Sequence, residues 1–179
     1  MKIWKKHIET YIHDMQKPQS DSMRMVPIGY DPDKDYIFYN KRYFNNPKYQ
    51  LPANMTFGHE LAHRYDHLEI RSWENKDFVG AIEAAIKKIQ SNADKYKDLY
   101  ISLDSPNLAF QDILSVLSDN KIKVGFGHES TYWDKPNMKA LEIFANASYL
   151  QANHIELPRF DGLLDDKMEI VKTMYLRGG

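Results

Sequence analysis

The sequence contains no cysteine, and this absence excludes two kinds of structure at once. Neither a disulfide bond nor a thiolate metal site can form in this chain. Any metal ion that it binds must therefore be held by histidine and carboxylate side chains. The composition also leaves the redox compartment of the protein open.

The chain likewise lacks an excess of charge of either sign and any long apolar run. Its 24 basic and 25 acidic side chains nearly cancel, which argues against nucleic acid or an anionic membrane surface as the main partner. No segment approaches the length needed to span a bilayer, and the polar start of the chain predicts no signal peptide. We therefore expect no membrane partner and, by default, a cytoplasmic location.

The length and the remaining composition favour one folded domain. Of the 179 residues, 42% are hydrophobic and 27% are charged. A chain of this length and composition can form one well-buried core but is short for two. We expect a single domain over residues 1–179. Aromatic residues reach 13%, with twelve tyrosines, and suit a domain with a partly polar groove.

The most informative motif is His-Glu-x-x-His, formed by His59, Glu60 and His63. Histidines four positions apart on a helix share one face, about 6 Å apart along the axis, so both imidazoles can bind one metal ion. Glu60 lies between them and can accept a proton from a water molecule that the same ion activates. The motif indicates a zinc site with a general base, and another part of the chain must supply a third ligand.

The surrounding residues favour the helix that this motif needs. Neither proline nor glycine occurs from His59 to Ile70. Apolar residues recur there at helical spacing, namely Leu61, Ala62, Tyr65 and Leu68. We predict a helix over about residues 56–71, capped by Asn54 or Thr56. Chance would produce the motif about once in 70 sequences of this composition, so ordinary histidines on an amphipathic helix remain an alternative.

Asp66 and His67 lie further along the same predicted helix. His67 would be about 12 Å along the axis from His59, too far for both to reach one ion through bonds of roughly 2 Å. We therefore expect His67 to face solvent or to support a ligand. Asp66 can orient the imidazole of His63, with a solvated helix charge as the alternative.

Glu142 is a single carboxylate within an apolar stretch that follows Pro136. A buried carboxylate needs a cation or strong hydrogen bonds to stay ionised, and a zinc ion would satisfy it. Asn146 follows one helical turn later and can hydrogen-bond to a metal ligand. Without the upstream motif, an exposed helix carboxylate would be the preferred interpretation of Glu142.

The segment from residue 121 to residue 133 is rich in glycine and aromatic residues and contains His128 and Tyr132. This composition is typical of a loop that lines a site.

The remaining pattern predicts several helices and one hairpin. Residues 25–30 and 35–39 should pair around the turn Asp31-Pro32-Asp33-Lys34, and the hairpin serves either to bind an extended peptide along its edge or only to cover the core. Further helices are expected at residues 2–17, 77–100, 108–120, 136–150 and 163–176.

Two of these stretches together resemble a known zinc-binding core. Residues 59–66, followed by Glu142-Ile143-Phe144-Ala145-Asn146-Ala147, resemble the anthrax lethal factor type of metallopeptidase and its small secreted Pro-Pro endopeptidase relatives. Those families combine His-Glu-x-x-His with a Glu-Phe-Phe-Ala-Glu type helix. The resemblance implies His59, His63 and Glu142 as zinc ligands, Glu60 as the base and Tyr132 as the tyrosine that faces the zinc. Asn146 stands where the second Glu of that helix would be.

A second resemblance covers roughly residues 35 to 150. Residues 111–115, 127–133 and 142–145 are similar to a metallopeptidase-like domain of phage head-morphogenesis (minor head) proteins. This similarity implies phage capsid or portal proteins as partners, and the host cytoplasm or the phage particle as the location.

These features lead to one main expectation about fold and function. We predict an α+β, zincin-like domain, mainly helical, in which the helices of His59 and Glu142 cross behind a small sheet. The expected activity is zinc-dependent peptide hydrolysis, with Glu60 as base and with Tyr132 or His128 stabilising the oxyanion. The alternatives are a non-catalytic phage head assembly component with a structural metal site, and a toxin-like effector peptidase.

Overall fold

The structure is a computed structural model that describes residues 28–39, 53–101, 108–122, 128–155 and 169–173. Its elements are the strands β1 (Ile28–Asp31) and β2 (Tyr36–Tyr39), the helix α3 (Ala53–Tyr65), the π-helical turn η4 (Asp66–Ile70), the 3₁₀ turn η5 (Ser72–Glu74), the helices α4 (Lys76–Ser91), α5 (Ala93–Ile101) and α6 (Leu108–Ser118), the 3₁₀ turn η6 (Ser130–Tyr132) and the helix α7 (Met138–Ala152). Over these ranges the chain is mainly helical with a two-stranded antiparallel sheet, which confirms the predicted α+β class.

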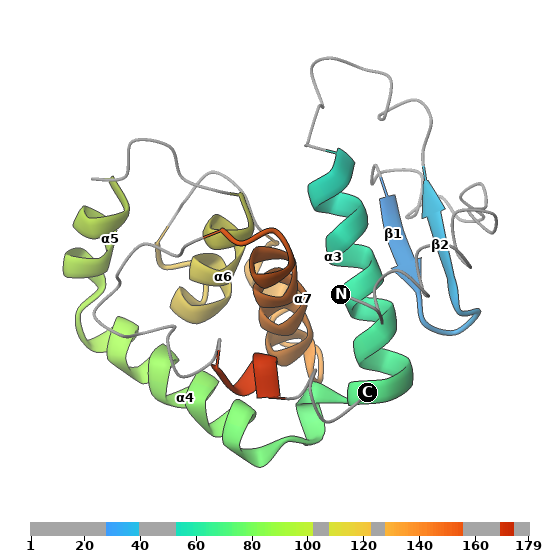
Figure 1. The fold of residues 1–179 in the computed structure, drawn as a ribbon. Coiled ribbons are helices and arrows are strands. Elements are labelled where there is room, and N and C mark those ends of the chain that lie inside the picture. The colour runs from blue at the N-terminus through green and yellow to red at the C-terminus, as the bar shows by residue number, and fades with distance from the viewer. Residues whose placement is uncertain (1–27, 40–52, 102–107, 123–127, 156–168, 174–179) are drawn as a thin grey trace.

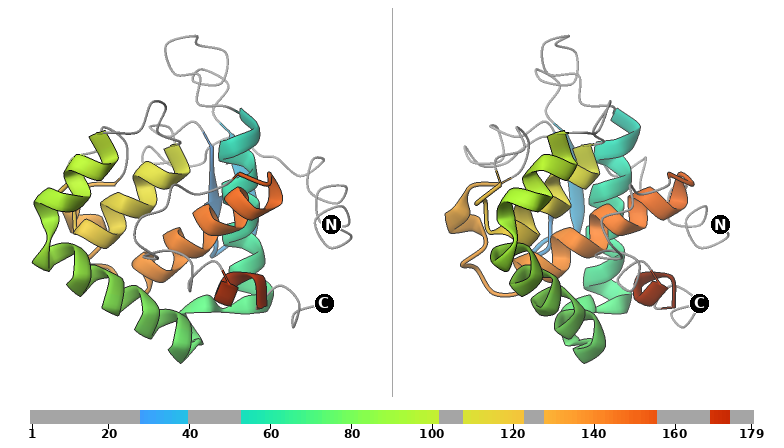
Figure 2. Two further views of the ribbon diagram at one scale, coloured as in Figure 1. Left: turned by 60° about the vertical axis from the view of Figure 1, so that its left-hand side comes forward. Right: turned by 90° about the vertical axis from the view of Figure 1, so that its left-hand side faces the viewer.

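The described elements stack side by side around α3 and α7. Figure 1 shows α3 between the hairpin and α7, with α6 on the far side of α7 and α4 running below both. The left view of Figure 2 again shows α7 between α6 and α3. Helix α3 therefore has the sheet on one side and the helical layer on the other, as predicted for a helix that lies behind a small sheet.

The hairpin is an antiparallel pair whose register places Ile28 opposite Tyr39 and Tyr30 opposite Ile37. These four side chains pack with Leu61 and Phe57 of α3 in a small apolar cluster. The Oδ1 atom of Asp31 accepts hydrogen bonds from the backbone N–H groups of Asp33 and Lys34, which closes the turn. The predicted hairpin is confirmed, and residues 25–27 of its first predicted strand lie outside the described residues.

Helix α3 begins at Ala53, so Asn54 and Thr56 lie inside the helix and the predicted cap at either residue is wrong. Its regular α-helical part ends at Tyr65 rather than at the predicted residue 71, and a π turn follows. Both carboxylate oxygens of Asp66 accept hydrogen bonds of 2.6 Å from Ser72, one from its backbone N–H and one from its hydroxyl. Asp66 is fully buried and thus stabilises the end of the helix instead of remaining a solvated charge.

The region predicted as one helix over residues 77–100 consists of two helices. Asn75 caps the first by accepting hydrogen bonds from the backbone N–H groups of Asp77 and Phe78. The break falls at Asn92, whose backbone departs from helical geometry between α4 and α5. Of the helix predicted at residues 163–176, only residues 169–173 are described, and they are helical, whereas the helix predicted at residues 2–17 lies outside the description.

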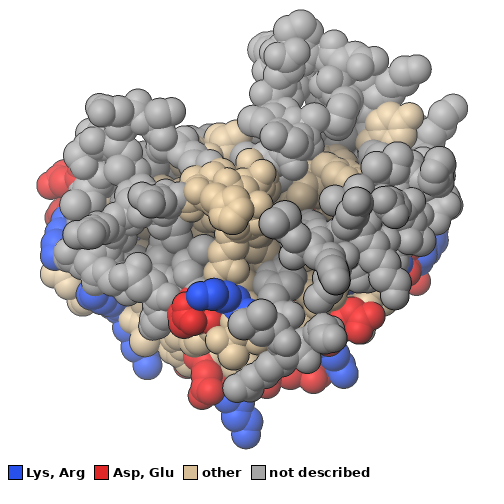
Figure 3. Space-filling model, viewed as in Figure 1, with Lys and Arg blue, Asp and Glu red and all other residues tan. Residues whose placement is uncertain are grey.

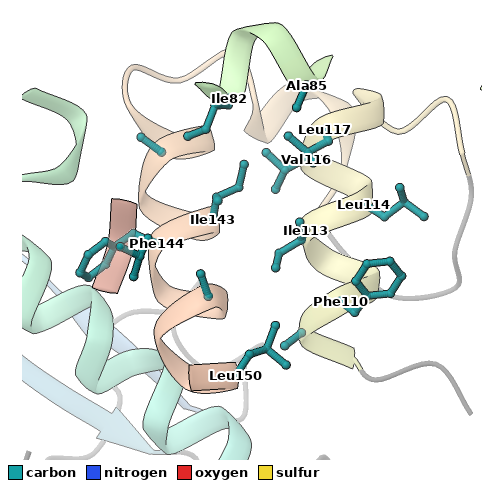
Figure 4. Packing of buried hydrophobic residues seen from close by; sticks show 14 of the residues in the cluster. Ile82, Ala85, Phe110, Ile113, Leu114, Val116, Leu117, Ile143, Phe144 and Leu150 are labelled. Atoms are coloured by element: carbon teal, nitrogen blue, oxygen red, sulfur yellow. The ribbon is translucent and has the colours of Figure 1, made fainter. Parts of the chain in front are cut away.

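The main apolar core lies between α4, α6 and α7. Figure 4 shows side chains of all three helices meeting there, among them Ile82, Ala85, Ile113, Val116, Leu117, Ile143 and Leu150. Phe144 of α7 is fully buried and meets the ring of Phe78 edge to face, with ring centroids 6.5 Å apart. This core fixes α7 from behind, and α7 in turn places Glu142.

Helices α3 and α7 approach each other closely where the motif begins. A Cβ atom at Gly58 would lie 3.2 Å from the Tyr149 ring, a contact tighter than normal packing, so glycine permits the approach. His59 follows directly and is thereby held against the face of α7.

The described surface carries charges of both signs. On the face in Figure 3, blue and red side chains are interspersed along the rim near α4, as expected for its solvated side. Within the described ranges, we find no helix with the length and hydrophobicity to cross a bilayer.

Candidate metal centre

His59 and His63 project from one face of α3, and Glu142 reaches them from α7. The Nε2 atoms of the two imidazoles are 2.9 Å apart. The Oε2 atom of Glu142 lies 3.1 Å from the Nε2 atom of His59 and 3.4 Å from that of His63. The structure therefore brings together the three residues that the sequence identified as ligands.

The spacing of these three atoms fits a metal ion. Tetrahedral ligands with bonds of roughly 2.0–2.1 Å lie about 3.3 Å from each other, close to all three separations. The Oε2 atom of Glu142 is buried and has no hydrogen-bond partner among the described residues. A cation within the triangle would supply this oxygen with a partner. The three residues can thus hold a metal ion.

A hydrogen-bond chain behind His59 orients its imidazole. The Nδ2 amide of Asn146 donates to the Oδ2 atom of Asp112 at 2.7 Å and to the backbone carbonyl of Glu142 at 2.9 Å. The Oδ1 atom of Asn146 therefore faces the Nδ1 atom of His59, at 3.2 Å. Since an amide oxygen only accepts, Nδ1 of His59 carries the proton and Nε2 offers its lone pair to the candidate metal position.

Asp112 is the site residue that the sequence reasoning missed. It lies on α6, is only 3% exposed, and binds the amide that orients His59. Burial and the charge of Glu142 raise the pKa of Asp112 to about 6, although nearby imidazoles and the Asn146 hydrogen bond oppose this shift. Glu142 is indicated by the sequence because it is a single carboxylate in an apolar helix. Asp112 fits the same pattern, since it lies between Phe110 and Ile113 in another apolar helix.

Tyr132 and His128 reach Glu142 from the segment before α7, at its other carboxylate oxygen. The Tyr132 hydroxyl donates a 2.7 Å hydrogen bond to Oε1, and the Nε2 atom of His128 lies 3.4 Å from the same atom. The two rings are stacked, with centroids 3.8 Å apart. Burial and the charge of Glu142 raise the pKa of Tyr132, so its hydroxyl remains a proton donor at neutral pH.

Glu60 lies between the two histidines on α3, close enough for both imidazoles to influence its ionisation. Burial, together with the charge of Glu142, raises the pKa of Glu60 above its usual value, although His59, His63 and a hydrogen bond from the backbone of Tyr30 oppose this shift. The Tyr30 contact joins Glu60 to β1. The predicted base thus lies beside the candidate ligands and the edge of the sheet.

The charges of the centre stabilise one another in the absence of a metal ion. Burial raises the pKa of Glu142, but the neighbouring imidazoles, His63 foremost, outweigh it and hold that pKa well below its usual range. Burial lowers the pKa of His59, but the nearby carboxylate of Glu142 outweighs burial and raises this pKa to about 9. Without a metal ion, His59 is therefore protonated at neutral pH, and a metal ion that binds must displace this proton.

Asp66 and His67, which follow α3 in the π turn η4, do not join the centre. His67 is exposed, and its ring contacts those of Tyr30 and Trp73. Both carboxylate oxygens of Asp66 accept hydrogen bonds from Ser72, so Asp66 takes neither of its two expected roles, orienting the His63 imidazole or carrying a solvated charge. The centre thus consists of residues from α3, α6 and α7 and from the segment that precedes α7.

Comparison with models of protein families, with curated proteins and with solved structures finds no match to this chain.

Proposed function

We propose that this protein is a zinc-dependent peptidase whose metal ligands are His59, His63 and Glu142. The observation that carries the proposal is the triangle of two imidazole nitrogens and one buried carboxylate oxygen, with the motif glutamate beside it. Two nitrogens and one oxygen are a usual ligand set of catalytic zinc, which keeps its fourth position open. When bound, zinc would supply a Lewis acid that lowers the pKa of a coordinated water toward 7 and polarises the scissile carbonyl.

Glu60 is the proposed general base. It would take the proton of the attacking water and pass it to the leaving amine. Its burial favours the neutral acid, while the two adjacent imidazoles favour the carboxylate. These opposing effects suit a group that must both accept and release a proton.

Tyr132 is the proposed oxyanion donor, with His128 stacked against it. The Tyr132 hydroxyl is aimed at Glu142, next to the proposed zinc ligands, and its raised pKa keeps the proton on the oxygen. The hydroxyl can rotate about its C–O bond while the ring stays in place, so its single proton would turn from Oε1 of Glu142 to the carbonyl oxygen and stabilise the negative charge that develops there. The stacked ring of His128 restricts the tyrosine to this orientation.

The position of β1 supports a peptide substrate. Because the backbone of Tyr30 contacts Glu60, the edge of β1 that does not face β2 adjoins the proposed active site. An extended peptide that pairs with such an edge would pass beside the base. The resemblance to phage head-morphogenesis domains makes capsid and portal proteins the first substrates to test, and the toxin-like alternative predicts a host or competitor protein instead.

The competing proposal is an assembly component with a closed, structural metal site. A closed site needs a fourth protein ligand, and the third histidine of the centre is His128. The Nε2 atom of His128 faces the Oε1 atom of Glu142, not the oxygen that points at His59 and His63. This arrangement favours an open position and therefore a catalytic site.

The experiment that tests the proposed activity compares wild type with Glu60→Gln. Zinc content is measured by metal analysis, and both proteins are incubated with a peptide library. We expect zinc in both and cleavage by wild type alone, since the substitution removes the base and no ligand. Zinc in both without cleavage by either would support the assembly role, and no zinc in either would overturn the assignment of the site.

A further inference from the structure

The two carboxylate oxygens of Glu142 face two different groups of side chains. Its Oε2 atom points at the imidazoles of His59 and His63. Its Oε1 atom lies 2.7 Å from the Tyr132 hydroxyl and 3.4 Å from the Nε2 atom of His128. The proposed zinc ion uses only the first oxygen, so the second is available for other chemistry.

A second group of donor atoms surrounds the other side of Glu142. Asp112, His128 and Glu142 each offer one atom, and these three atoms lie within 4.8 Å of one another. They come from α6, from the segment before η6 and from α7. Glu142 is thus common to two groups that each contain three potential metal ligands.

Only one of the two carboxylate oxygens of Asp112 accepts a hydrogen bond from the described residues. Its Oδ2 atom accepts from Asn146, but its buried Oδ1 atom has no hydrogen-bond partner within the described part of the chain. Leaving a buried acceptor unpaired destabilises the folded protein, and the cost is larger when the group is charged. Asp112 also lies close enough to Glu142 for the two negative charges to repel each other. A cation between them would relieve both costs.

We propose that Asp112, His128 and the Oε1 atom of Glu142 form a second divalent-metal position, so that Glu142 bridges two metal ions. The inference rests on the proposed zinc site, because a bridge needs an ion on each side. Carboxylate-bridged ions in two-metal hydrolases lie about 3.5–4 Å apart and clamp the reacting oxygens between them. The bridge would explain why a carboxylate at the centre of the site has imidazoles at both of its oxygens.

The donor set indicates which ions fit the second position. Two carboxylate oxygens and one imidazole form a harder set than the two imidazoles and one carboxylate of the first position. We therefore expect zinc or manganese, bound more weakly than the first ion. The Tyr132 hydroxyl need not leave, because a carboxylate oxygen has two lone pairs and can accept a hydrogen bond while it binds an ion.

Metal stoichiometry tests this inference directly. The full chain, stripped with chelator, is dialysed against zinc or against manganese, and bound metal is counted in wild type, Asp112→Asn and His128→Gln. We expect two ions per chain in wild type and one in each variant. His128→Gln is the safer variant for folding, because the His128 side chain is 43% exposed whereas that of Asp112 is buried. His154→Gln, which changes an exposed histidine outside the site, should keep two ions.

Each other outcome of this experiment contradicts a definite claim. One ion per wild-type chain with both metals would overturn the second position and leave the proposed zinc site intact. Two ions in wild type and in both variants would also overturn it, because the second ion would then bind elsewhere. No bound ion would overturn the zinc site together with the inference that rests on it.

Discussion

The Oδ1 atom of Asn146 lies 3.2 Å from the Nδ1 atom of His59 and holds this imidazole with its Nε2 atom toward Glu142. The contact joins α7 to α3, and Asp112 fixes the amide from α6. Three helices thus determine the orientation of one histidine. Asn146 makes this hydrogen bond through a neutral amide, so it orients the imidazole without adding a charge to the buried centre.

Replacing Asn146 by alanine should weaken zinc binding by about 10–100-fold, because His59 would lose the acceptor that fixes its tautomer. Competition with a chromophoric chelator measures this affinity. Asn153→Ala is a matched control, since Asn153 lies just beyond the end of the same helix and donates to the backbone carbonyl of Tyr149, away from the site. Equal zinc affinities for the two variants would contradict the orienting role of Asn146.

Removing the Tyr132 hydroxyl should slow peptide hydrolysis and leave zinc bound. Loss of one oxyanion donor costs about a hundredfold or more in turnover. Tyr132→Phe should therefore lower kcat by that factor at unchanged zinc content, as measured with a peptide that wild type cleaves. A variant with the turnover of wild type would show that Tyr132 does not stabilise the oxyanion.

Zinc binding should weaken as the pH falls. Without metal, burial lowers the pKa of His59 but Glu142 outweighs it, leaving a pKa of about 9, and a ligand imidazole must be neutral. Below this pKa, each ion must displace the His59 proton, so apparent affinity should drop about tenfold per pH unit from about pH 8 to about pH 6. Calorimetric titration in buffers of different ionisation enthalpy counts the released protons. Affinity that stays constant over this range would contradict protonation of the free site.

Two glycines should respond in opposite ways to substitution by alanine. A Cβ atom at Gly29 would overlap the ring of Phe38, its cross-strand partner, so Gly29→Ala should lower the free energy of unfolding by about 1–3 kcal/mol. Gly80 is exposed within α4, and nothing lies within 4 Å of an added Cβ atom. Gly80→Ala should therefore raise the free energy of unfolding by about 0.5–1 kcal/mol. Urea denaturation measures both, and destabilisation by Gly80→Ala would contradict the open environment of that residue.

Local pattern was sufficient to predict the hairpin and the adjacency of His59 and His63. Both depend on spacing within one element, since alternation fixes the faces of a strand and four positions form one turn of helix. Glu142 could be suspected as a ligand because an apolar helix offers a carboxylate few other partners. The same reasoning applied to Asp112 would have added it to the predicted site.

Other features depend on contacts that spacing within one element does not contain. The end of α3 is determined by the bonds of Asp66 to Ser72, which require the backbone of Arg71 to adopt a left-handed conformation. The bond between Asn146 and His59 depends on how closely α3 and α7 approach, which Gly58 permits through packing against Tyr149. Such contacts between distant segments appear only in the folded chain.

The most direct test of the central claim is an anomalous difference map, recorded at the zinc absorption edge from crystals of zinc-loaded protein. The account predicts a strong peak about 2.0–2.2 Å from the Nε2 atoms of His59 and His63 and from the Oε2 atom of Glu142. A map without a peak between these three atoms, or with zinc only at surface residues, would contradict the proposed metal centre.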